Sequence, residues 1–406
     1  MLARAPYVRI WRELSADKCL ILMAGPRQCG KTTLARMVAE SKPNQLYFNW
    51  DIPTDKRKLI QDPFFFQALP RTDSSKPLII FDEIHKYRHW KNYLKGVYDQ
   101  FQHDFSFLVT GSGRLDAYQR GGDSLAGRYY LFHLWPLTLA ELGGRQASFD
   151  AFQANPLTIP DTPKPELAGI WDRLERFSGF PEPYLTAKPT SYRRWTTAYH
   201  QRLIREDIRD MTAIKSVDMV EALFQLLPAR IGSPLSLTAL AEDLKVAYNT
   251  IASWLSVFER FYLIFTLKPW TQAVTRSIRK ERKTYLLDYA LIDDPAARFE
   301  NMVAVELLRA VSAWNDIGAG HYSLHFIRDK EKREVDFLIA DKLKPKLLVE
   351  AKLGDEAPSP ALWRFQQRLN VPAVQLVRNA SQYRLLHNGA NRLLIAPPWL
   401  WLPSLP

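Results

Sequence analysis

An apolar strand-like segment, a loop bounded by glycines and a helix-like segment follow one another near the start of the chain, and this order restricts the fold most. Residues 20–23 are continuously apolar, as in a buried strand, and residues 31–41 have helical periodicity. The loop between them reads Gly25-Pro26-Arg27-Gln28-Cys29-Gly30-Lys31-Thr32. In such a loop, backbone N–H groups and the helix N-terminus meet a phosphate. The pattern predicts a P-loop in an α/β domain.

Each part of the predicted P-loop has an expected role in binding ATP and Mg²⁺. Lys31 is expected to reach the β- and γ-phosphates, and Thr32 to supply an oxygen ligand to Mg²⁺. The predicted nucleotide-binding set is Gly25, Pro26, Arg27, Gln28, Cys29, Gly30, Lys31, Thr32 and Thr33.

A pair of acidic residues follows a second apolar run, at residues 77–81. Asp82 is predicted to hold the Mg²⁺ shell, and Glu83 to polarise the water that attacks the γ-phosphate. The alternative is a strand that ends in a solvated acidic turn. A later strand ends near residue 110, where Ser112, with Thr110 as the nearest alternative, is expected to contact the γ-phosphate or orient the water.

Arg128 precedes another predicted strand, at residues 130–134, and is predicted to act as an arginine finger supplied to a neighbouring subunit. The alternative is a surface arginine. Together with strands expected at residues 45–50 and 105–110, these segments predict a mostly parallel sheet with helices on its faces.

The length of 406 residues exceeds one ordinary core and predicts several domains. A net charge of +12 favours a polyanionic partner such as DNA or RNA, although a basic protein without such a partner has the same composition. Cys19 and Cys29 form neither a disulfide framework nor a metal-ligand cluster, which favours a reducing cytoplasm. No stretch reaches the roughly 18 apolar residues that span a bilayer, so we expect neither export nor membrane insertion.

A middle segment is similar to a winged helix-turn-helix. Apolar residues recur with helical spacing in 237–244 and again in 247–255, with a polar break between them. The second helix is expected to present Tyr248, Asn249 and Thr250 to a DNA groove or to phosphates, and the basic run from Arg276 to Lys283 resembles the wing. The alternative is that this segment mediates packing between domains or subunits.

The C-terminal segment resembles a restriction-endonuclease-like core. Asp336 stands on one predicted strand, and Glu350 and Lys352 stand on the next, where alternation places both on one face. The carboxylates would bind Mg²⁺ while Lys352 stabilises charge on the attacked phosphate, and Glu300 on the preceding helix resembles the fourth member of the set. Either a nuclease or an inactive module that holds DNA is consistent with these residues.

Several motifs together resemble the prokaryotic AAA-type ATPases that carry a nuclease-like C-terminal domain. Besides the P-loop, they are Asp82-Glu83-Ile84-His85, Thr110-Gly111-Ser112, Gly127-Arg128, Pro136-Leu137, Gly179-Phe180-Pro181-Glu182 and Phe299-Glu300-Asn301. The resemblance implies an α/β fold with an AAA-type P-loop ATPase domain at 1–145, a helical lid at 146–230, a winged helix at 231–290 and a restriction-endonuclease-like domain at 291–406.

From these observations we expect a Mg-ATP-hydrolysing, DNA-binding motor or remodeller. The resemblance implies self-association, with a hexameric ring as the expected assembly. Two other functions stay open. One is a nucleotide-dependent switch that binds a partner protein, and the other is a DNA nuclease gated by ATP.

Overall fold

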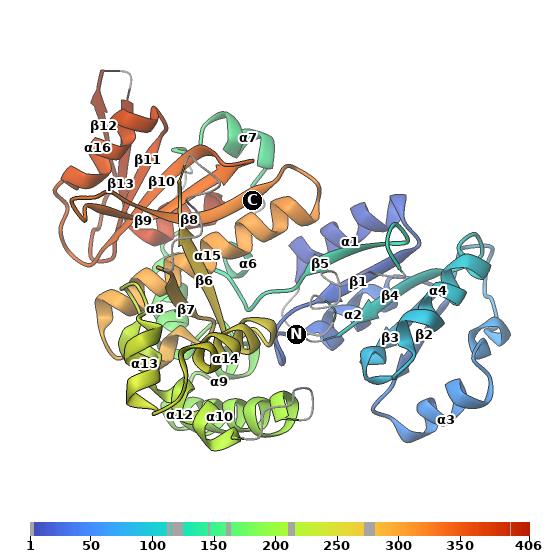
Figure 1. Ribbon diagram of the computed structural model, residues 1–406. Coiled ribbons are helices and arrows are strands. Elements are labelled where there is room, and N and C mark those ends of the chain that lie inside the picture. Colours follow the sequence, from blue (N-terminus) through green and yellow to red (C-terminus); the bar gives the residue numbers. More distant parts are fainter. Residues whose placement is uncertain are drawn as a thin grey trace. The chain divides into compact units, whose positions relative to one another are not determined.

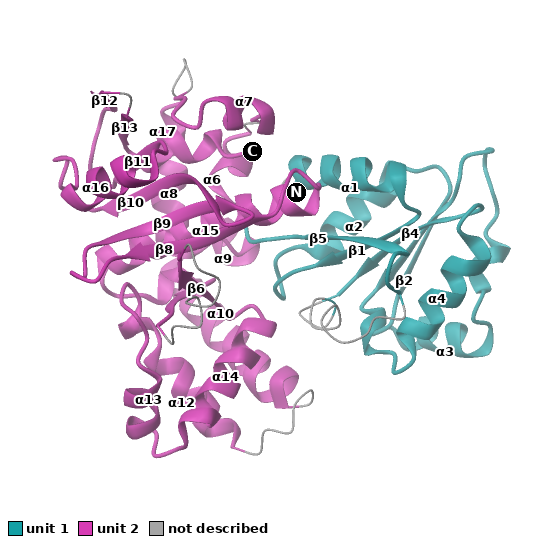
Figure 2. Cartoon of the chain, turned by 45° about the horizontal axis from the view of Figure 1, so that its top comes forward, with its two compact units in different colours: residues 1–136 teal, residues 137–406 magenta. Residues whose placement is uncertain are grey.

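The computed structural model describes residues 4–111, 115, 125–144, 147–159, 164–209, 216–271, 281–389 and 391–406. The chain forms two compact units, Met1–Pro136 and Leu137–Pro406, which Figure 2 shows in different colours. Among the helices of the described ranges, none combines the length and the hydropathy that crossing a bilayer requires.

The first unit is built on a sheet of five described strands that are all parallel to their neighbours (Figure 1). The strands are β1 (Leu20–Ala24), β2 (Gln45–Asn49), β3 (Leu78–Asp82), β4 (Ser106–Thr110) and β5 (Tyr129–His133). Their order across the sheet is β2-β3-β4-β1-β5. The expectation of a parallel sheet is confirmed, and each strand lies where the apolar pattern predicts it.

The burial of these strands follows their place in the sheet. The inner strands β1 and β3 are buried along their whole length, whereas the edge strands β2 and β5 are partly exposed. Along β1, Ile21 and Met23 enter one apolar cluster while Leu20, Leu22 and Ala24 enter another, because successive side chains point to opposite faces. Continuous apolar sequence is thus what a strand covered on both faces requires.

Four described helices complete the first unit. They are α1 (Ala5–Asp17), α2 (Lys31–Glu40), α3 (Pro53–Gln61) and α4 (Trp90–Phe101). Trp11 of α1 and Leu34 of α2 share a cluster with Ile21, whereas Leu94 of α4 packs with Leu22 in the other cluster. The two clusters therefore fix α2 at the carboxyl end of β1, where the P-loop is expected.

The second unit contains a mixed sheet of eight described strands in the order β12-β13-β11-β10-β9-β8-β6-β7. The bounds are β6 (Ile264–Pro269), β7 (Lys283–Leu286), β8 (Tyr322–Arg328), β9 (Glu334–Asp341), β10 (Lys344–Lys352), β11 (Ala373–Val377), β12 (Arg384–Asn388) and β13 (Asn391–Ala396). Strands β8, β9 and β10 are antiparallel neighbours, whereas β10, β11 and β13 run parallel. The expected division at residue 290 falls between β7 and β8, which belong to this one sheet.

Helices precede and flank this sheet. They include α6 (Leu139–Leu142), α7 (Phe149–Ala154), α8 (Glu166–Phe177), α9 (Pro181–Thr186), α10 (Pro189–Arg202), α12 (Val217–Leu226), α13 (Leu237–Asp243), α14 (Tyr248–Arg260), α15 (Pro295–Asp316), α16 (Pro360–Leu369) and α17 (Pro398–Trp401). Helices α13 and α14 occupy the two segments predicted for short helices. They are followed by the antiparallel pair β6 and β7.

Helix α15 is the long buried helix of the second unit. It begins with Asp294, whose side chain accepts a hydrogen bond from the Ala297 N–H, and with Pro295 in the first turn. All its residues from Asn301 to Leu307 are buried, so no side of this part faces solvent. The reason is that α15 packs against both the sheet, at β8 and β10, and helix α8.

Glu306 is a charged residue on this buried helix. Its Oε1 accepts a hydrogen bond from the Leu139 N–H at 2.8 Å, which anchors the start of α6. Burial raises the pKa of Glu306 to about 7, and the nearby Arg309 opposes that rise only in part. Because the folded-state pKa lies above the ordinary value of 4.5, folding favours the protonated carboxyl.

Replacement of Glu306 with Gln should therefore change how stability depends on pH. Between pH 4.5 and about 7 the unfolded chain binds fewer protons at this position, so the wild-type free energy of unfolding falls as pH rises. Glu306→Gln keeps an oxygen that can accept from the Leu139 N–H. We expect its free energy of unfolding to rise relative to that of wild type by on the order of 3 kcal/mol across this window. Urea unfolding followed by tryptophan fluorescence at several pH values measures the difference. A difference that is constant from pH 4 to pH 8 would contradict the assignment.

Candidate functional site

The loop between β1 and α2 has the conformation that its glycines allow. Gly25 has φ +148° and Gly30 has φ +99°, and residues other than glycine rarely adopt these values. A Cβ atom at Gly25 would lie 2.1 Å from the backbone oxygen of Leu134. The loop therefore approaches the end of β5 closely, and only glycine fits at this position.

Lys31 begins α2 and turns its ammonium group back into the loop. Its Nζ donates hydrogen bonds to the Gly25 oxygen at 3.0 Å and to the Pro26 oxygen at 2.6 Å, and the residue is only 6% exposed. A buried cation held by two carbonyl groups at a helix N-terminus is a favourable position for a phosphate oxygen. The structure places Lys31 inside the loop, as its predicted role requires.

Further contacts fasten the loop to the rest of the first unit. Arg4 donates from Nη1 to the Cys29 oxygen and from Nη2 to the Trp135 oxygen, both at 2.7 Å. The Cys29 thiol donates to the Leu134 oxygen at 3.2 Å. Arg4 was not predicted, because an isolated arginine before the first strand has no distinguishing pattern in the sequence.

The carboxylate of Asp82 is the centre of the hydrogen-bond network beside the loop. Its Oδ2 accepts from the Thr32 hydroxyl at 2.7 Å and from the Tyr47 hydroxyl at 2.5 Å, and its Oδ1 accepts from the Thr110 hydroxyl. Asp82 is 1% exposed, whereas Thr32 is exposed. The two predicted Mg²⁺ residues, Thr32 and Asp82, therefore lie in direct contact, and both offer the hard oxygen atoms that Mg²⁺ prefers.

Tyr47 is a member of this network that sequence reasoning missed. It lies on β2, and the register that pairs Asn49 with Asp82 brings its side chain next to the carboxylate. Burial, together with the hydrogen bond to Asp82, raises the pKa of Tyr47 to about 12. The phenol therefore keeps its proton and donates to Asp82 at neutral pH.

Glu83 follows Asp82 with a left-handed backbone, φ +58°. Its Oε2 lies 3.2 Å from the Lys86 Nζ, which in turn lies 2.5 Å from Oδ2 of Asp51. Burial lowers the pKa of Lys86, but Glu83 and Asp51 outweigh it and raise that pKa above its ordinary value. The Glu83 carboxylate thus lies at the carboxyl edge of the sheet beside a permanent cation.

Ser112 and Arg128 are the remaining residues of the predicted catalytic set. Ser112 lies outside the described residues, so its role stays a prediction, whereas its alternative, Thr110, contacts Asp82. Arg128 donates from Nε to Oδ1 of Asp99 on α4 at 2.7 Å, and its side chain is 29% exposed. Its action on a neighbouring subunit stays a prediction as well.

In the second unit, a buried lysine lies among three carboxylates. The Nζ of Lys283 is 2.7 Å from Oε1 of Glu334, 3.0 Å from Oε1 of Glu300 and 3.4 Å from Oδ1 of Asp336. Tyr285 also donates to Oε1 of Glu300, at 2.8 Å. Burial opposes the charge of Lys283, but the carboxylates outweigh it and raise the pKa of Lys283.

The predicted nuclease-like residues converge on this lysine and the adjacent end of β10. Oδ2 of Asp336 accepts from the Ala351 N–H at 3.0 Å, between Glu350 and Lys352 in the chain. Lys352 lies 2.8 Å from Oε1 of Glu350. Burial and the charge of Asp336 raise the pKa of both Glu300 and Glu350 to about 7. Glu300 and Asp336 thus share Lys283, and Asp336 reaches the backbone between the paired Glu350 and Lys352. No group of His, Cys, Asp and Glu in the described part of the chain has the arrangement of a metal site.

The position of Lys283 corrects one expectation. Lys283 is 1% exposed and belongs to β7, so it does not lie in a basic wing along a nucleic acid. The physical reason is its pairing with three half-buried carboxylates, which offset the cost of burying the ammonium group. Arg276 and the following residues up to 280 lie outside the described residues.

Comparisons with known proteins divide the chain in three. Residues 17–143 match the family model of an AAA domain. Residues 171–296 and 296–394 match two domains of unknown function, DUF8612 and DUF4143. The first unit accordingly has the α/β fold of an AAA-type P-loop ATPase domain, a fold that implies nucleotide binding.

Other known proteins are similar to this chain over longer parts of its length. An uncharacterized protein of Mycobacterium tuberculosis is 24% identical over 273 residues, which are 67% of this chain and 55% of that protein. The chain thus spans about half the length of this relative. An uncharacterized protein of Methanocaldococcus jannaschii is 24% identical over 378 residues, covering 85% of this chain and 78% of that protein. The solved Walker-type ATPase of Pyrococcus abyssi is 15% identical with a TM-score of 0.45, covering 72% of this chain and 95% of that chain.

The close approach of the loop to β5 can be tested with an added methyl group. Gly25→Ala should lower the free energy of unfolding of the first unit by about 2 kcal/mol or more, because the backbone oxygen of Leu134 must move. Gly96→Ala is the matched control, since a Cβ there meets no atom within 4 Å in the middle of α4. It should stabilise α4 by about 0.5–1 kcal/mol. Equal stability of the two variants in urea unfolding would contradict the contact.

Proposed function

We propose that this chain binds Mg-ATP at the P-loop of its first unit and hydrolyses it. The observation that supports this most is the contact between the Thr32 hydroxyl and Asp82, beside a loop that holds the Lys31 ammonium at its centre. A phosphate-binding loop alone would support binding. The carboxylates of Asp82 and Glu83, at the end of β3, add the groups that hydrolysis requires.

Lys31 has a defined task in this proposal. In the structure its ammonium group is satisfied by the Gly25 and Pro26 oxygens. When the triphosphate binds, phosphate oxygens replace these carbonyl groups as acceptors, and the charge of Lys31 then stabilises them. Thr32 and Asp82 would hold Mg²⁺, which neutralises charge on the β- and γ-phosphates when it is bound.

Glu83 is the proposed general base for the attacking water. It directly follows Asp82, and its pairing with Lys86 keeps its carboxylate at the same edge of the sheet. Removing the charge of Glu83 should therefore affect the chemical step, whereas removing the charge of Lys31 should affect binding.

Two substitutions separate these roles. Lys31→Ala should weaken the binding of a fluorescent ATP analogue by about tenfold or more, because a charged hydrogen-bond donor is lost. Glu83→Gln should leave binding within about twofold but reduce turnover by about 100-fold or more. Glu40→Gln, at the exposed end of α2, is the control and should retain both properties. If both test variants lose binding equally, the role of Glu83 is wrong.

We further propose that ATP turnover is coupled to DNA held by the second unit, in an oligomer with Arg128 presented to the neighbouring subunit. Two observations favour DNA as the partner. The chain carries a net charge of +12, and Tyr248 and Asn249 are exposed at the start of α14. Helices α13 and α14 followed by β6 and β7 would then act as a winged helix, and the helices before them as a lid.

The contacts in the carboxylate cluster favour holding DNA over cleaving it. Lys283 contacts Glu300 and Asp336, and Lys352 contacts Glu350, so each carboxylate of the predicted nuclease-like set already has a lysine partner. We therefore assign the restriction-endonuclease-like part of the second unit the role of holding DNA. A regulatory switch that binds a partner protein is the alternative, and it predicts turnover that is indifferent to DNA.

The pattern of ATP turnover with different nucleic acids distinguishes these functions. We expect duplex, single-stranded or branched DNA to raise turnover severalfold, and the rise to diminish steeply between 50 and 200 mM salt. RNA is measured in parallel, and light scattering with ATP tests the assembly. No response to any nucleic acid, together with a co-purifying protein, would favour the switch.

The same preparations distinguish a holding role from a cutting role. We expect no nicking of supercoiled DNA with Mg²⁺ or Mn²⁺ and ATP. Nicking that disappears in Asp336→Ala while ATP turnover is unchanged would replace the holding role with a nuclease.

A further inference from the structure

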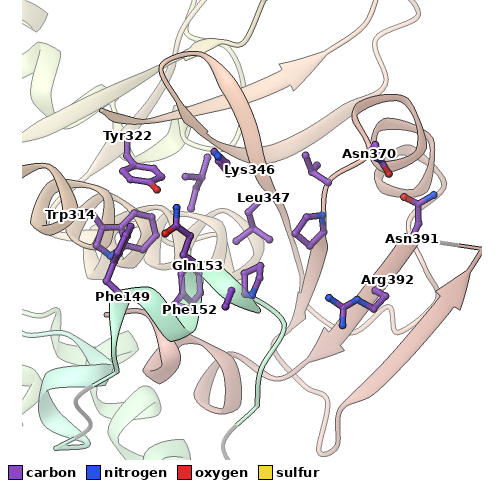
Figure 3. A pocket seen from close by; sticks show the side chains of 15 residues that line it. Phe149, Phe152, Gln153, Trp314, Tyr322, Lys346, Leu347, Asn370, Asn391 and Arg392 are labelled. Atoms are coloured by element: carbon purple, nitrogen blue, oxygen red, sulfur yellow. The ribbon is translucent and has the colours of Figure 1, made fainter. Parts of the chain in front are cut away.

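A cavity of about 310 Å³ lies in the second unit, away from the carboxylate cluster around Lys283. Its walls come from α7, the end of α15, strands β8 to β10, the turn after α16 and the start of β13. Figure 3 shows the side chains that line it. The cavity has no part in the nucleotide site, which belongs to the first unit.

One end of the cavity is aromatic (Figure 3). Phe149 and Phe152 are spaced by three residues on α7, so both lie on the same side of that helix. Their rings contact Trp314, with centroids 5.5 and 5.4 Å from it, and Tyr322 lies 5.1 Å from the same tryptophan. Trp314 is buried, whereas the two phenylalanines are half-buried.

The other end of the cavity is polar (Figure 3). Asn370, Asn391 and Arg392 gather there, and Lys346 lies between the two ends. Lys346 and Arg392 are exposed, and neither forms an ion pair with a described residue. No described lining residue is acidic. The two cations therefore have no counter-charge within the cavity.

This combination of walls restricts the chemistry of a ligand. An aromatic wall attracts a planar apolar ring through edge-to-face and offset contacts. An arginine and a lysine without acidic partners attract an anionic group, and arginine can bind it with two parallel hydrogen bonds. The volume is that of a small-molecule site, for which about 300–1,000 Å³ is usual.

We propose that this cavity binds a small molecule that carries a planar apolar ring system at one end and an anionic group at the other. The ring lies against Phe149, Phe152 and Trp314, and the anionic group lies between Lys346 and Arg392. Asn370 and Asn391 supply hydrogen bonds at the polar end. This site does not depend on the proposed ATPase activity.

The experiment uses two fluorescent probes that differ in charge. The probe 8-anilino-1-naphthalenesulfonate has linked rings and a sulfonate, and N-phenyl-1-naphthylamine has the same rings without the charge. We expect the full chain to bind the sulfonate saturably. The double variant Lys346→Gln/Arg392→Gln should bind it about tenfold or more weakly and bind the neutral probe within about twofold of wild type.

Matched controls remove the same charges elsewhere in the second unit. Lys330 and Arg364 are exposed, and their double replacement by Gln should leave the affinity for both probes unchanged. Phe152→Ala should weaken the binding of both probes, because part of the aromatic wall that contacts their rings is lost. Circular dichroism verifies that each variant is folded.

Three results would overturn the proposal. They are the absence of saturable binding of the sulfonate probe, equal affinity of the Lys346/Arg392 variant and wild type, and an equal loss in the Lys330/Arg364 control. In the last case the probe responds to net charge rather than to this cavity.

Discussion

The carboxylate of Asp82 is buried and accepts hydrogen bonds from hydroxyl groups on three different elements, α2, β2 and β4. A buried carboxylate without such partners costs several kcal/mol, so these elements cannot shift independently. The three hydroxyl partners differ in their exposure to solvent. Thr110 is buried, Tyr47 is half-buried and Thr32 is exposed. The contact with Thr32 is therefore the one that a ligand from solvent can replace while the other two keep Asp82 in place.

The second unit stabilises its clustered carboxylates in the opposite way. Lys283 provides a positive charge from within the chain, and its contacts with Glu300, Glu334 and Asp336 need nothing from solvent. Asp82 has hydroxyl partners but no lysine or arginine at salt-bridge distance among the described residues. The hydroxyl partners leave the negative charge of Asp82 for a cation to neutralise, whereas Lys283 already supplies one positive charge to the three carboxylates around it. The two clusters therefore differ in chemistry even though both are rich in carboxylates.

Patterns that are local in the chain predicted the structure well, and contacts between distant residues did not. The strands of the first unit, the P-loop between β1 and α2, and the helices α13 and α14 follow from apolar periodicity and glycine placement. Arg4 and Tyr47 escaped prediction because their partners, at Cys29 and Asp82, are remote in sequence. Lys283 was misassigned because its neighbours in the chain are basic, whereas its neighbours in space are acidic. A charge pattern along the chain shows only which residues are neighbours in sequence.

The carbonyl group of Leu134 joins the phosphate loop to the last residues of the first unit. It accepts the Cys29 thiol, and Gly25 lies so close to it that a methyl group would not fit. Trp135 and Pro136 follow directly and complete the first unit, and Arg4 ties the Trp135 carbonyl to the loop as well. The phosphate loop and the outgoing chain are thus one mechanically continuous body. Any ligand that reshapes the loop must therefore keep or break hydrogen bonds to the last residues of the first unit.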